Sequence, residues 1–516
     1  MTKNLYILDE VNSDEVLKFE LDNCKIVVFD YASHRQLTKN NIAHTLIDDF
    51  LSDNERQEIF KFCSKYLVEL EEYTNKQTTY HGINLINIID RNELLESLMY
   101  IVPQAYALKK IIEKENYDYI YTSSRLYEIF HKTDLTKKFV KLKESSKSEL
   151  TFEKITIPIN FSKINFNFTL SREKYQKMKN ILEKISISLF SFSNYNPDIK
   201  KIVLIELDPE VYQELLREIK QQDMQAILVN FRKSTVYSKK ALDILRETNS
   251  LVFTSEQIIE KDVLREMNVE KKQIINYLKN NSLKKELIPE LKFNEIELTY
   301  FLEQKINDIL IQRNDEYLNS ILIAEKLSQD KNNVGVLMLN NSGETEKIFS
   351  RKFEDSSIYL LQHAFANYLE SISYFDLLDD FHRIRENIVV WGNLVRDYLI
   401  NIRKFSDEQI LVVGSPKYDS FSKLEKSNKK YNRILVTLRP VISHMEGLRI
   451  EVYNRYEETL KRLVKFSDEH PDIEMILKLH PQQNLNNEII KNMINGKKQI
   501  KVLQSGGVKE LLAECD

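Results

Sequence analysis

Four predicted strands in the C-terminal part of the chain each end in residues that can do chemistry. The strand ends carry Gln362-His363, Gly414-Ser415-Pro416, Leu438-Arg439-Pro440 and His480-Pro481. Arginine and histidine can bind a phosphate through charge-assisted hydrogen bonds, and histidine also titrates near neutral pH, where it can act as a general base. These residue types predict a site that holds an anionic group and moves a proton.

His480 and Arg439 are the main candidates for contact with a phosphate. Pro481 follows His480, and proline in the first turn of a helix gives up no amide that the helix needs, so a phosphate can meet the helix start there. Arg439, followed by Pro440, offers a fixed fork of donors that suits phosphate. A capping histidine on a surface loop and a surface salt bridge are the alternatives for these two side chains.

Other residues of the same region could complete such a site. Glu446 could accept a hydrogen bond from a hydroxyl of a ligand. Gly414 and Ser415 make a tight turn after a strand, which would shape the site. Ser505 and Gly506 precede the last predicted helix, where backbone amides could bind a phosphate. For the glycines, plain turns are the alternative.

Two residues are candidates for the general base. His363 ends a predicted strand, and a hydrogen-bonded histidine at a domain interface is the other interpretation of it. Glu344 opens a predicted helix after another strand and is a reserve base. Ser342, just before it, fits an ordinary N-cap equally well.

Alternating strands and helices must position these residues. The predicted strands cover 5–9, 24–31, 117–124, 202–207, 226–231, 250–255, 334–340, 357–363, 387–392, 409–416, 433–440, 473–481 and 499–503. Close β-α-β spacing predicts right-handed crossovers and parallel sheets, whose ligands bind at the carboxyl ends of the strands. The alternation of strands and helices predicts an α/β protein. A chain of 516 residues is too long for a single hydrophobic core, so we expect at least two domains.

Other stretches depart from this alternation. Residues 133–200 alternate at period two and predict an antiparallel insertion. Helices are expected over 40–72 and 92–114, and a long helical region over about 255–330, opened by a capping box of Thr254 with Gln257. Its heptad-like apolar positions could pair two protomers or pack inside one chain.

The composition is that of an ordinary globular protein. Hydrophobic residues make up 42% and charged residues 29%, and 74 Lys and Arg against 78 Asp and Glu give a net charge of −4, which predicts no broad basic surface for nucleic acid. The three cysteines, Cys24, Cys63 and Cys515, form no CxxC pair, so neither a disulfide framework nor structural zinc is expected. No stretch approaches the roughly 20 apolar residues that span a bilayer, and a cytoplasmic location is expected.

In their order along the chain, these motifs resemble those of a known family. QHA (362–364), VVGSPKYD (412–419), LRP (438–440) and KLHP (478–481) are similar to motifs of GT-B fold glycosyltransferases that build bacterial and archaeal surface polysaccharides. Relatives of that family include capsule Kdo transferases, bacterial sialyltransferases and CDP-glycerol glycerophosphotransferases. Two positions differ from its pattern, because Ala364 replaces a glycine and Arg439 replaces a glutamine.

The resemblance implies two Rossmann-like domains that face a cleft, an acceptor-side domain over 1–385 and a nucleotide-donor domain over 386–516. It implies that His480 contacts the donor phosphate and that His363 is the base of a metal-independent, inverting transfer. The implied donor is a sugar linked to CMP, CDP or UDP, and the acceptor is a glycan or a lipid-linked glycan. No cofactor and no metal are expected, while a homodimer and peripheral association with the inner face of the membrane would fit.

Three other functions remain open from the sequence. The chain could transfer glycerol phosphate from CDP-glycerol, or act as a UDP-GlcNAc 2-epimerase-like isomerase, which needs a carboxylate-rich cleft. It could also be a catalytically silent scaffold in a glycan assembly complex. Only five strands are predicted from Ile388 onward, where the family's donor domain has about six, so the sequence is expected to end before that domain does.

Overall fold

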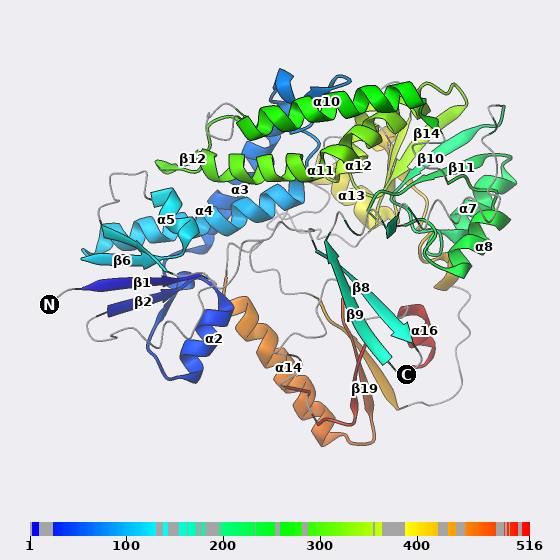
Figure 1. The fold of residues 1–516 in the computed structure, drawn as a ribbon. Helices are drawn as coiled ribbons and strands as arrows, with labels where there is room; N and C mark the ends of the chain where they lie inside the picture. The colour runs from blue at the N-terminus through cyan, green and yellow to red at the C-terminus, as the bar shows by residue number, and fades with distance from the viewer. Residues whose placement is uncertain are drawn as a thin grey trace.

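The computed structural model of the chain contains three parallel β-sheets among the residues that it describes (Figure 1). The described residues are 3–9, 24–130, 138–142, 154–161, 164–171, 174, 178–179, 181, 196, 198–232, 234–252, 258–280, 287–353, 357–363, 387–421, 432–439, 449–480, 490, 493–494, 496–503 and 508–515.

The first sheet has five parallel strands in the order β3-β2-β1-β6-β7. Its strands are β1 (Asn4–Leu8), β2 (Cys24–Val28), β3 (Thr45–Leu46), β6 (Tyr119–Thr122) and β7 (Phe139–Lys141), and its helices are α2 (Tyr31–Lys39), α3 (Asp53–Glu72), α4 (Arg91–Lys114) and α5 (Ser124–Phe130). The predicted strands and the helix over 92–114 are confirmed. The helix expected over 40–72 begins only at Asp53, because Ser52 and Glu55 form a capping box there.

The central sheet has six parallel strands in the order β11-β10-β14-β15-β16-β17. Its strands are β10 (Lys201–Ile205), β11 (Gln225–Val229), β14 (Asn333–Met338), β15 (Ile358–Leu361), β16 (Ile388–Val390) and β17 (Ile410–Val412), and its helices are α7 (Gln213–Gln221), α8 (Lys239–Glu247), α10 (Lys261–Asn280), α11 (Thr299–Ser328), α12 (Glu344–Lys352) and α13 (Asn393–Asn401). Of the strand expected over 250–255, the structure describes 250–252, where Leu251 forms a parallel bridge with Ile227, and 253–255 lie outside the described residues. The predicted capping box of Thr254 with Gln257 lies outside the described residues.

The order of the central strands reverses at β10. Strand β11, next in the chain, lies on one side of β10, and β14 and the later strands lie on the other. In parallel α/β sheets, ligands bind outside the carboxyl ends of the strands at such a reversal. The loops after β10, β11 and β14 are therefore the first place to look for a site.

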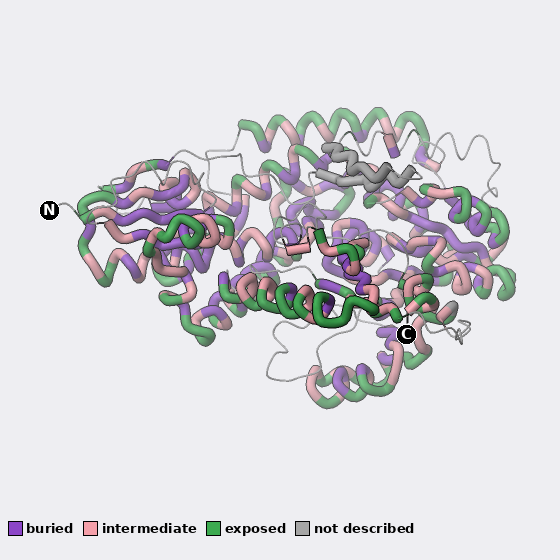
Figure 2. The backbone as a smooth tube through the Cα atoms, turned by 90° about the horizontal axis from the view of Figure 1, so that it is seen from below, coloured by how far each residue is buried: buried purple, intermediate pink, exposed green. Residues whose placement is uncertain are grey.

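A layer of long helices connects the first sheet to the central sheet (Figure 1). One continuous buried apolar cluster includes residues of β1, α3 and α4 as well as of α11 and β14. On α11, Leu302, Ile306, Ile309 and Leu310 are fully buried inside the chain, so these positions serve its own core rather than a second copy. Figure 2 shows the same distribution, with buried residues concentrated in the sheets and inner helices.

The third sheet has three parallel strands in the order β18-β19-β20. They are β18 (Arg433–Thr437), β19 (Glu474–Lys478) and β20 (Ile500–Leu503), with helices α14 (Glu451–Glu469) and α16 (Val508–Ala513). Strands β15 and β16 pair directly with each other, so strands on both sides of the expected domain boundary at 385/386 share the central sheet. That boundary stays a prediction, while the third sheet begins at Arg433.

The predicted antiparallel insertion is confirmed for β8 (Lys154–Phe161) and β9 (Ile164–Ser171), which pair antiparallel. Its predicted start at 133 is wrong, because β7 lies inside 133–200 and pairs parallel with β6 in the first sheet. Two shorter hairpins pair β4 (Thr79–Tyr80) with β5 (Ile83–Asn84) and β12 (Lys292–Phe293) with β13 (Ile296–Glu297). The short 3₁₀ helices are η1 (Ile47–Asp49), η2 (Lys76–Thr78), η6 (Asp407–Gln409) and η7 (Asp419–Phe421). The three parallel sheets, with helices between their strands, confirm the predicted α/β class with Rossmann-like sheets.

The third sheet contacts the first through α14 (Figure 1). Tyr31, which follows β2, stacks on Tyr453 of α14 with 4.6 Å between ring centroids and donates a hydrogen bond to Glu457. The amide of Ile450 donates to Asp48 at 3.0 Å. Because Tyr31 and the start of α14 both follow the carboxyl end of a strand, these edges of the two sheets face each other.

Candidate functional site

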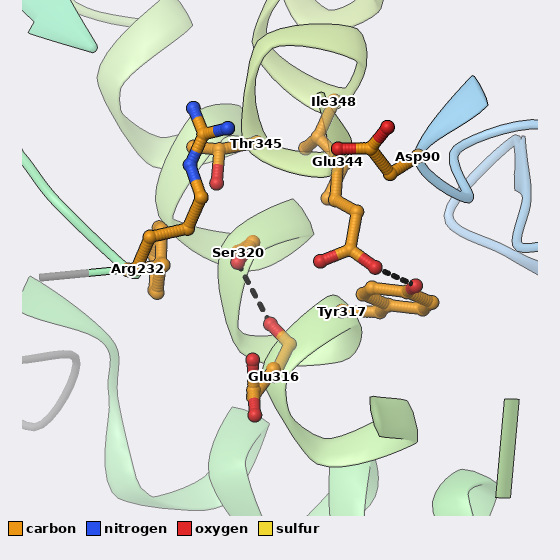
Figure 3. A pocket seen from close by; sticks show the side chains of 9 residues that line it. Asp90, Arg232, Glu316, Tyr317, Ser320, Glu344, Thr345 and Ile348 are labelled. Atoms are coloured by element: carbon orange, nitrogen blue, oxygen red, sulfur yellow. Dashed lines mark hydrogen bonds between the residues drawn. The ribbon is translucent and has the colours of Figure 1, made fainter. Parts of the chain in front are cut away.

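A pocket lies at the carboxyl edge of the central sheet, where the strand order reverses (Figure 3). It contains about 330 Å³ of space, part of it open to solvent. Its lining combines carboxylates, one arginine, hydroxyls and apolar groups, namely Asp90, Phe231, Arg232, Glu316, Tyr317, Ser320, Glu344, Thr345 and Ile348. The loop after β11, the first two turns of α12, the middle of α11 and the residue before α4 supply these side chains.

Glu344 is the one predicted base that lines this pocket, and its carboxylate already has partners. Arg313 Nη1 donates to Glu344 Oε1 at 2.7 Å, and the Tyr317 hydroxyl donates to the same oxygen. Arg313 also forms a bidentate pair with Glu93, at 2.6 and 3.1 Å, and Glu93 is fully buried. Burial raises the pKa of Glu93, and the charge of Arg313 opposes that shift. Glu344 therefore serves first as part of a buried ionic network.

The opposite wall of the pocket is held by a second ionic group. Arg232 forms an ion pair with the fully buried Glu346 of α12, and the Arg232 amide donates to Glu206 Oε1 at 3.0 Å. About 43% of the Arg232 side chain remains exposed, so its guanidinium is anchored and still accessible from the pocket. Burial raises the pKa of Glu346 to about 7, and Arg232 opposes this shift.

Asp90 caps α4 and lies beside Glu344 in the pocket lining (Figure 3). Its carboxylate accepts from the Asn92 amide at 2.8 Å. The preceding backbone is tied to α12, because Lys347 Nζ donates to the Ile89 carbonyl at 2.6 Å. Burial and the neighbouring charge of Glu344 raise the pKa of Asp90. The pocket thus holds a carboxyl group whose charged form is disfavoured.

The raised pKa of Glu346 predicts a pH dependence of stability. Between its ordinary value and about 7 the folded protein binds more protons than the unfolded chain, so the Glu346 contribution to stability falls as pH rises through this window. Glu346→Gln should remove this pH-dependent contribution to stability. We therefore expect the melting temperature of the wild type to fall relative to that of the variant between pH 5 and pH 7, as measured by differential scanning fluorimetry. A pH-independent difference would contradict the assignment.

The predicted phosphate-binding residues lie on the third sheet. Arg439 follows β18 and His480 follows β19, and these strands are parallel neighbours. Both residues are exposed. Burial lowers the pKa of His480, and the positive charges of Arg439 and Lys478 lower it further. The structure thus brings Arg439 and His480 together, but burial and the two nearby cations disfavour the charged form of His480 that a charge-assisted hydrogen bond to phosphate requires.

His363 lies apart from the pocket lining, exposed at the end of β15. The residue before it is fixed, because Trp391 Nε1 donates to the Gln362 carbonyl at 2.6 Å and the Trp391 amide donates to Gln362 Oε1 at 3.0 Å. β14 and β15 are parallel neighbours, so His363 and the pocket belong to the same edge of one sheet.

The remaining predicted residues divide into two groups. Gly414 adopts a φ of +84°, which favours glycine, and Ser415 follows it at the end of β17. Five predicted site residues lie outside the described residues, namely Pro440, Glu446, Pro481, Ser505 and Gly506. Their roles stay predictions.

Sequence reasoning missed most of the pocket. Asp90, Arg232, Arg313, Tyr317 and Glu346 were not among the predicted site residues. Arg232 could have been found, since it follows the predicted strand at 226–231 at the edge where ligands bind. Asp90 and Arg313 carry no such signal, because their partners lie far away in the sequence.

The described residues contain neither a metal-binding cluster nor a membrane-spanning helix. No group of three or more His, Cys, Asp or Glu residues there is arranged to hold a metal ion. None of the helices in this described part has the length and apolar content needed to cross a bilayer.

No protein-family model and no curated protein matches the chain. Solved structures overlap with part of it at low identity. The UDP-N-acetylglucosamine 2-epimerase from Rickettsia bellii is 10% identical at a TM-score of 0.34, covering 61% of this chain and 71% of that one. A glycosyltransferase from Rickettsia africae (12%, TM-score 0.28, covering 62% and 72%) and TarM (13%, TM-score 0.34, covering 62% and 80%) overlap similarly. At these TM-scores the overlap decides neither activity nor substrate.

Proposed function

We propose that the chain is a GT-B type glycosyltransferase that moves a sugar from a nucleotide-activated donor to a hydroxyl of a growing surface glycan. The observation that carries the proposal is the placement of Arg439 and His480. Both are exposed, and both follow the carboxyl ends of neighbouring parallel strands, where α/β sheets bind their ligands. An arginine fork beside a histidine suits the phosphates of a CMP-, CDP- or UDP-linked sugar.

The proposed reaction needs one base and one anion site. The acceptor oxygen forms a bond to the anomeric carbon, and the bond from that carbon to the donor phosphate breaks, so the nucleotide leaves with the bonding electrons. His363 takes the proton of the acceptor hydroxyl. Arg439 and His480 stabilise the negative charge that grows on the leaving phosphate. This route inverts the anomeric centre and takes its electrostatic stabilisation from protein side chains rather than from a metal.

His480→Ala should weaken nucleotide binding about tenfold to a hundredfold, since a hydrogen bond to a charged group contributes about 1.5–3 kcal/mol. Binding of the phosphate should also raise the depressed pKa of His480, so the wild type takes up a proton on binding and binds more tightly as pH falls. Calorimetric titration with CMP, CDP and UDP at several pH values measures both effects. The pH dependence in His480→Ala should differ from that of the wild type by the missing histidine proton, leaving only the contribution of the nucleotide's own phosphate.

His470→Ala is the matched control. His470 is also exposed, but it lies before the amino end of β19, away from the ligand edge. Its replacement should leave nucleotide affinity unchanged. If wild type binds none of the three nucleotides, the proposal fails and the chain is better explained as a silent scaffold. Equal weakening by both variants would show that the effect does not come from the edge of the third sheet.

A second candidate is an isomerase that epimerises a nucleotide sugar, and one observation favours it. Such a reaction needs carboxylates in a cleft, and Asp90, Glu316 and Glu344 line the central pocket. Incubation of wild type with UDP-GlcNAc and no acceptor separates the two functions. A C2 epimer detected by proton NMR would support the isomerase, whereas a product that appears only with an added acceptor supports transfer. A phosphodiester product from CDP-glycerol would instead indicate glycerophosphate transfer.

A further inference from the structure

The contact between the first and the third sheet contains a pair of histidines. His34 of α2 and His44, which directly precedes β3, form a hydrogen bond of 2.8 Å between Nδ1 of His34 and Nε2 of His44. Both rings are half-buried, and His34 faces α14, where Asn454 lies within hydrogen-bonding reach. We propose that this histidine pair is a pH-sensitive latch, which holds α14 and the third sheet against the first sheet at neutral pH and releases them in mild acid. The proposal concerns how two parts of the chain join, and it does not rest on the transferase function.

The hydrogen bonds around the pair fix where its protons lie. Nδ1 of His44 lies 2.8 Å from the Ile42 carbonyl, which can only accept, so Nδ1 carries a proton. In the neutral pair Nε2 of His44 is then an acceptor, and Nδ1 of His34 donates to it. The other ring nitrogen of His34 is left for α14. Asn454 can turn either its amide hydrogens or its oxygen toward that nitrogen.

This arrangement can take up one additional proton but not two. With one, every ring N–H still has an acceptor, because the Asn454 oxygen can accept from His34. With two, Nδ1 of His34 and Nε2 of His44 both carry hydrogen and point at each other across 2.8 Å. The two positive rings then repel each other while α14 limits their contact with water. Detachment of α14 lets water solvate both charges.

One carboxylate of α14 opposes this effect. Glu457 favours the charged form of His34, but it already accepts a hydrogen bond from the Tyr31 hydroxyl and lies 3.5 Å from Arg35 Nε. Burial and the charge of His44 outweigh the attraction of Glu457, and the pKa of His34 is lowered from its ordinary value. The docked state therefore disfavours the charged ring.

Asp48 of η1 also faces the pair and titrates in the opposite sense. Its carboxylate accepts from the Ile450 amide at 3.0 Å, and Arg56 Nη2 lies 3.5 Å away. Burial raises the pKa of Asp48, so its protonation favours the docked state as the pH falls. That effect begins near the ordinary aspartate pKa of about 4 and extends upward, so it reduces the response of the histidines without depending on them. The last ion pair between the two parts, Arg449 with the largely exposed Asp53, should add little.

The direction of the pH response follows from linkage. A histidine whose pKa is lower in the docked state than in water stabilises the docked state above its ordinary pKa of about 6.5, and this contribution is lost as the pH falls below that value. Each unit of lowering changes the docking equilibrium by up to about tenfold. The stacking of Tyr31 on Tyr453, with 4.6 Å between centroids, does not titrate in this range and sets a constant background.

Hydrogen–deuterium exchange of the full chain between pH 7.5 and pH 5.5 tests the latch. Mass spectrometry of peptides from 449–469, corrected for the pH dependence of intrinsic exchange, measures the protection of α14, whose start is tied to the first sheet (Figure 1). In the wild type we expect this protection to fall at least threefold from pH 7.5 to pH 5.5. Peptides from α11, in the buried core, should stay protected throughout and serve as an internal reference.

Two substitutions separate the histidine pair from other causes. His34→Gln takes up no proton, and its amide can still hydrogen-bond to His44 and Asn454, so its protection should stay constant over this pH range. His470→Gln is the matched control, because His470 is an exposed histidine at the opposite end of α14. This control should respond to pH as the wild type does.

Three results would overturn the proposal. The first is constant protection of α14 in the wild type, and the second is an equal pH response in His34→Gln and wild type. The third is a parallel loss of protection in α11, which would indicate acid unfolding of the whole chain. Where His34→Gln leaves α14 undocked at every pH, His44→Gln replaces it and should show a weaker pH response than the wild type. Nucleotide is absent from these measurements, so failure of the transferase proposal would leave their outcome unchanged.

Discussion

Replacing His363 with alanine is expected to lower kcat for sugar transfer by about 10²–10⁴-fold while the nucleotide dissociation constant stays unchanged. The reason is that the proposed base and the proposed phosphate contacts lie at the edges of two different sheets. His363 is exposed at the carboxyl end of β15, where it can reach an acceptor hydroxyl, whereas the proposed phosphate contacts come from β18 and β19. Loss of the base slows proton removal and leaves the anion site intact.

Added imidazole provides a sharper readout than activity alone. Since His363 is exposed and its neighbour Gln362 is fixed through Trp391, removal of the ring should leave room for a free imidazole at the same place. Millimolar imidazole should therefore restore part of kcat in His363→Ala, with no effect on His470→Ala. Equal loss of donor affinity in His363→Ala and His480→Ala would show that the roles of the two histidines are wrongly assigned.

The sequence predicted the parallel strands well, because a buried parallel strand is a short apolar run that ends in a polar or glycine residue. IVLIEL and AILVNF became β10 and β11, and VGVLMLN became β14. Which sheet a given strand joins was harder to predict. Whether β16 continues the central sheet or starts another depends on which edge strand it meets, and its own residues, Ile388–Val390, are apolar in either case.

The candidate site was predicted where a residue follows its strand directly, and was missed where it depends on distant contacts. Arg439 and His480 follow the carboxyl ends of two adjacent strands, so the parallel pairing of those strands alone brings the two residues together. Arg313 instead lies in the middle of a helix, within a pattern of apolar residues that is typical of a buried helix face. Its partner Glu93 is 220 residues away, and no local signal reports that pairing.

The network around Arg313 explains how the pocket is held open. Glu93 is in the first turn of α4, Arg313 is in the middle of α11 and Glu344 begins α12, so one guanidinium joins three helices. Arg313 and Glu93 are at most 1% exposed. Buried ion pairs add little net stability compared with apolar residues, but they leave a large penalty when one partner is lost. The arrangement therefore fixes geometry rather than adding stability.

Arg313→Met should consequently destabilise the protein by about 3–5 kcal/mol, because it leaves the buried Glu93 carboxylate and the partly buried Glu344 carboxylate without their shared cation. Lys305, 3.6 Å from Glu93, and the Tyr317 hydroxyl can compensate only in part. Both carboxyls then favour the protonated form in the folded state, so the loss should be greatest at neutral pH and smaller as pH falls.

Chemical denaturation measures this loss, and two further variants test its cause. Arg217→Met removes a bidentate pair with Glu247 of similar geometry, at 2.7 and 3.1 Å, on the surface, and should cost no more than about 1 kcal/mol. Glu93→Gln added to Arg313→Met should recover part of the lost stability, since it removes one of the two unpaired charges. If Arg313→Met behaved like Arg217→Met, or if the second substitution made the loss larger, the three-helix network would not be what positions Glu344 and Tyr317 in the pocket wall.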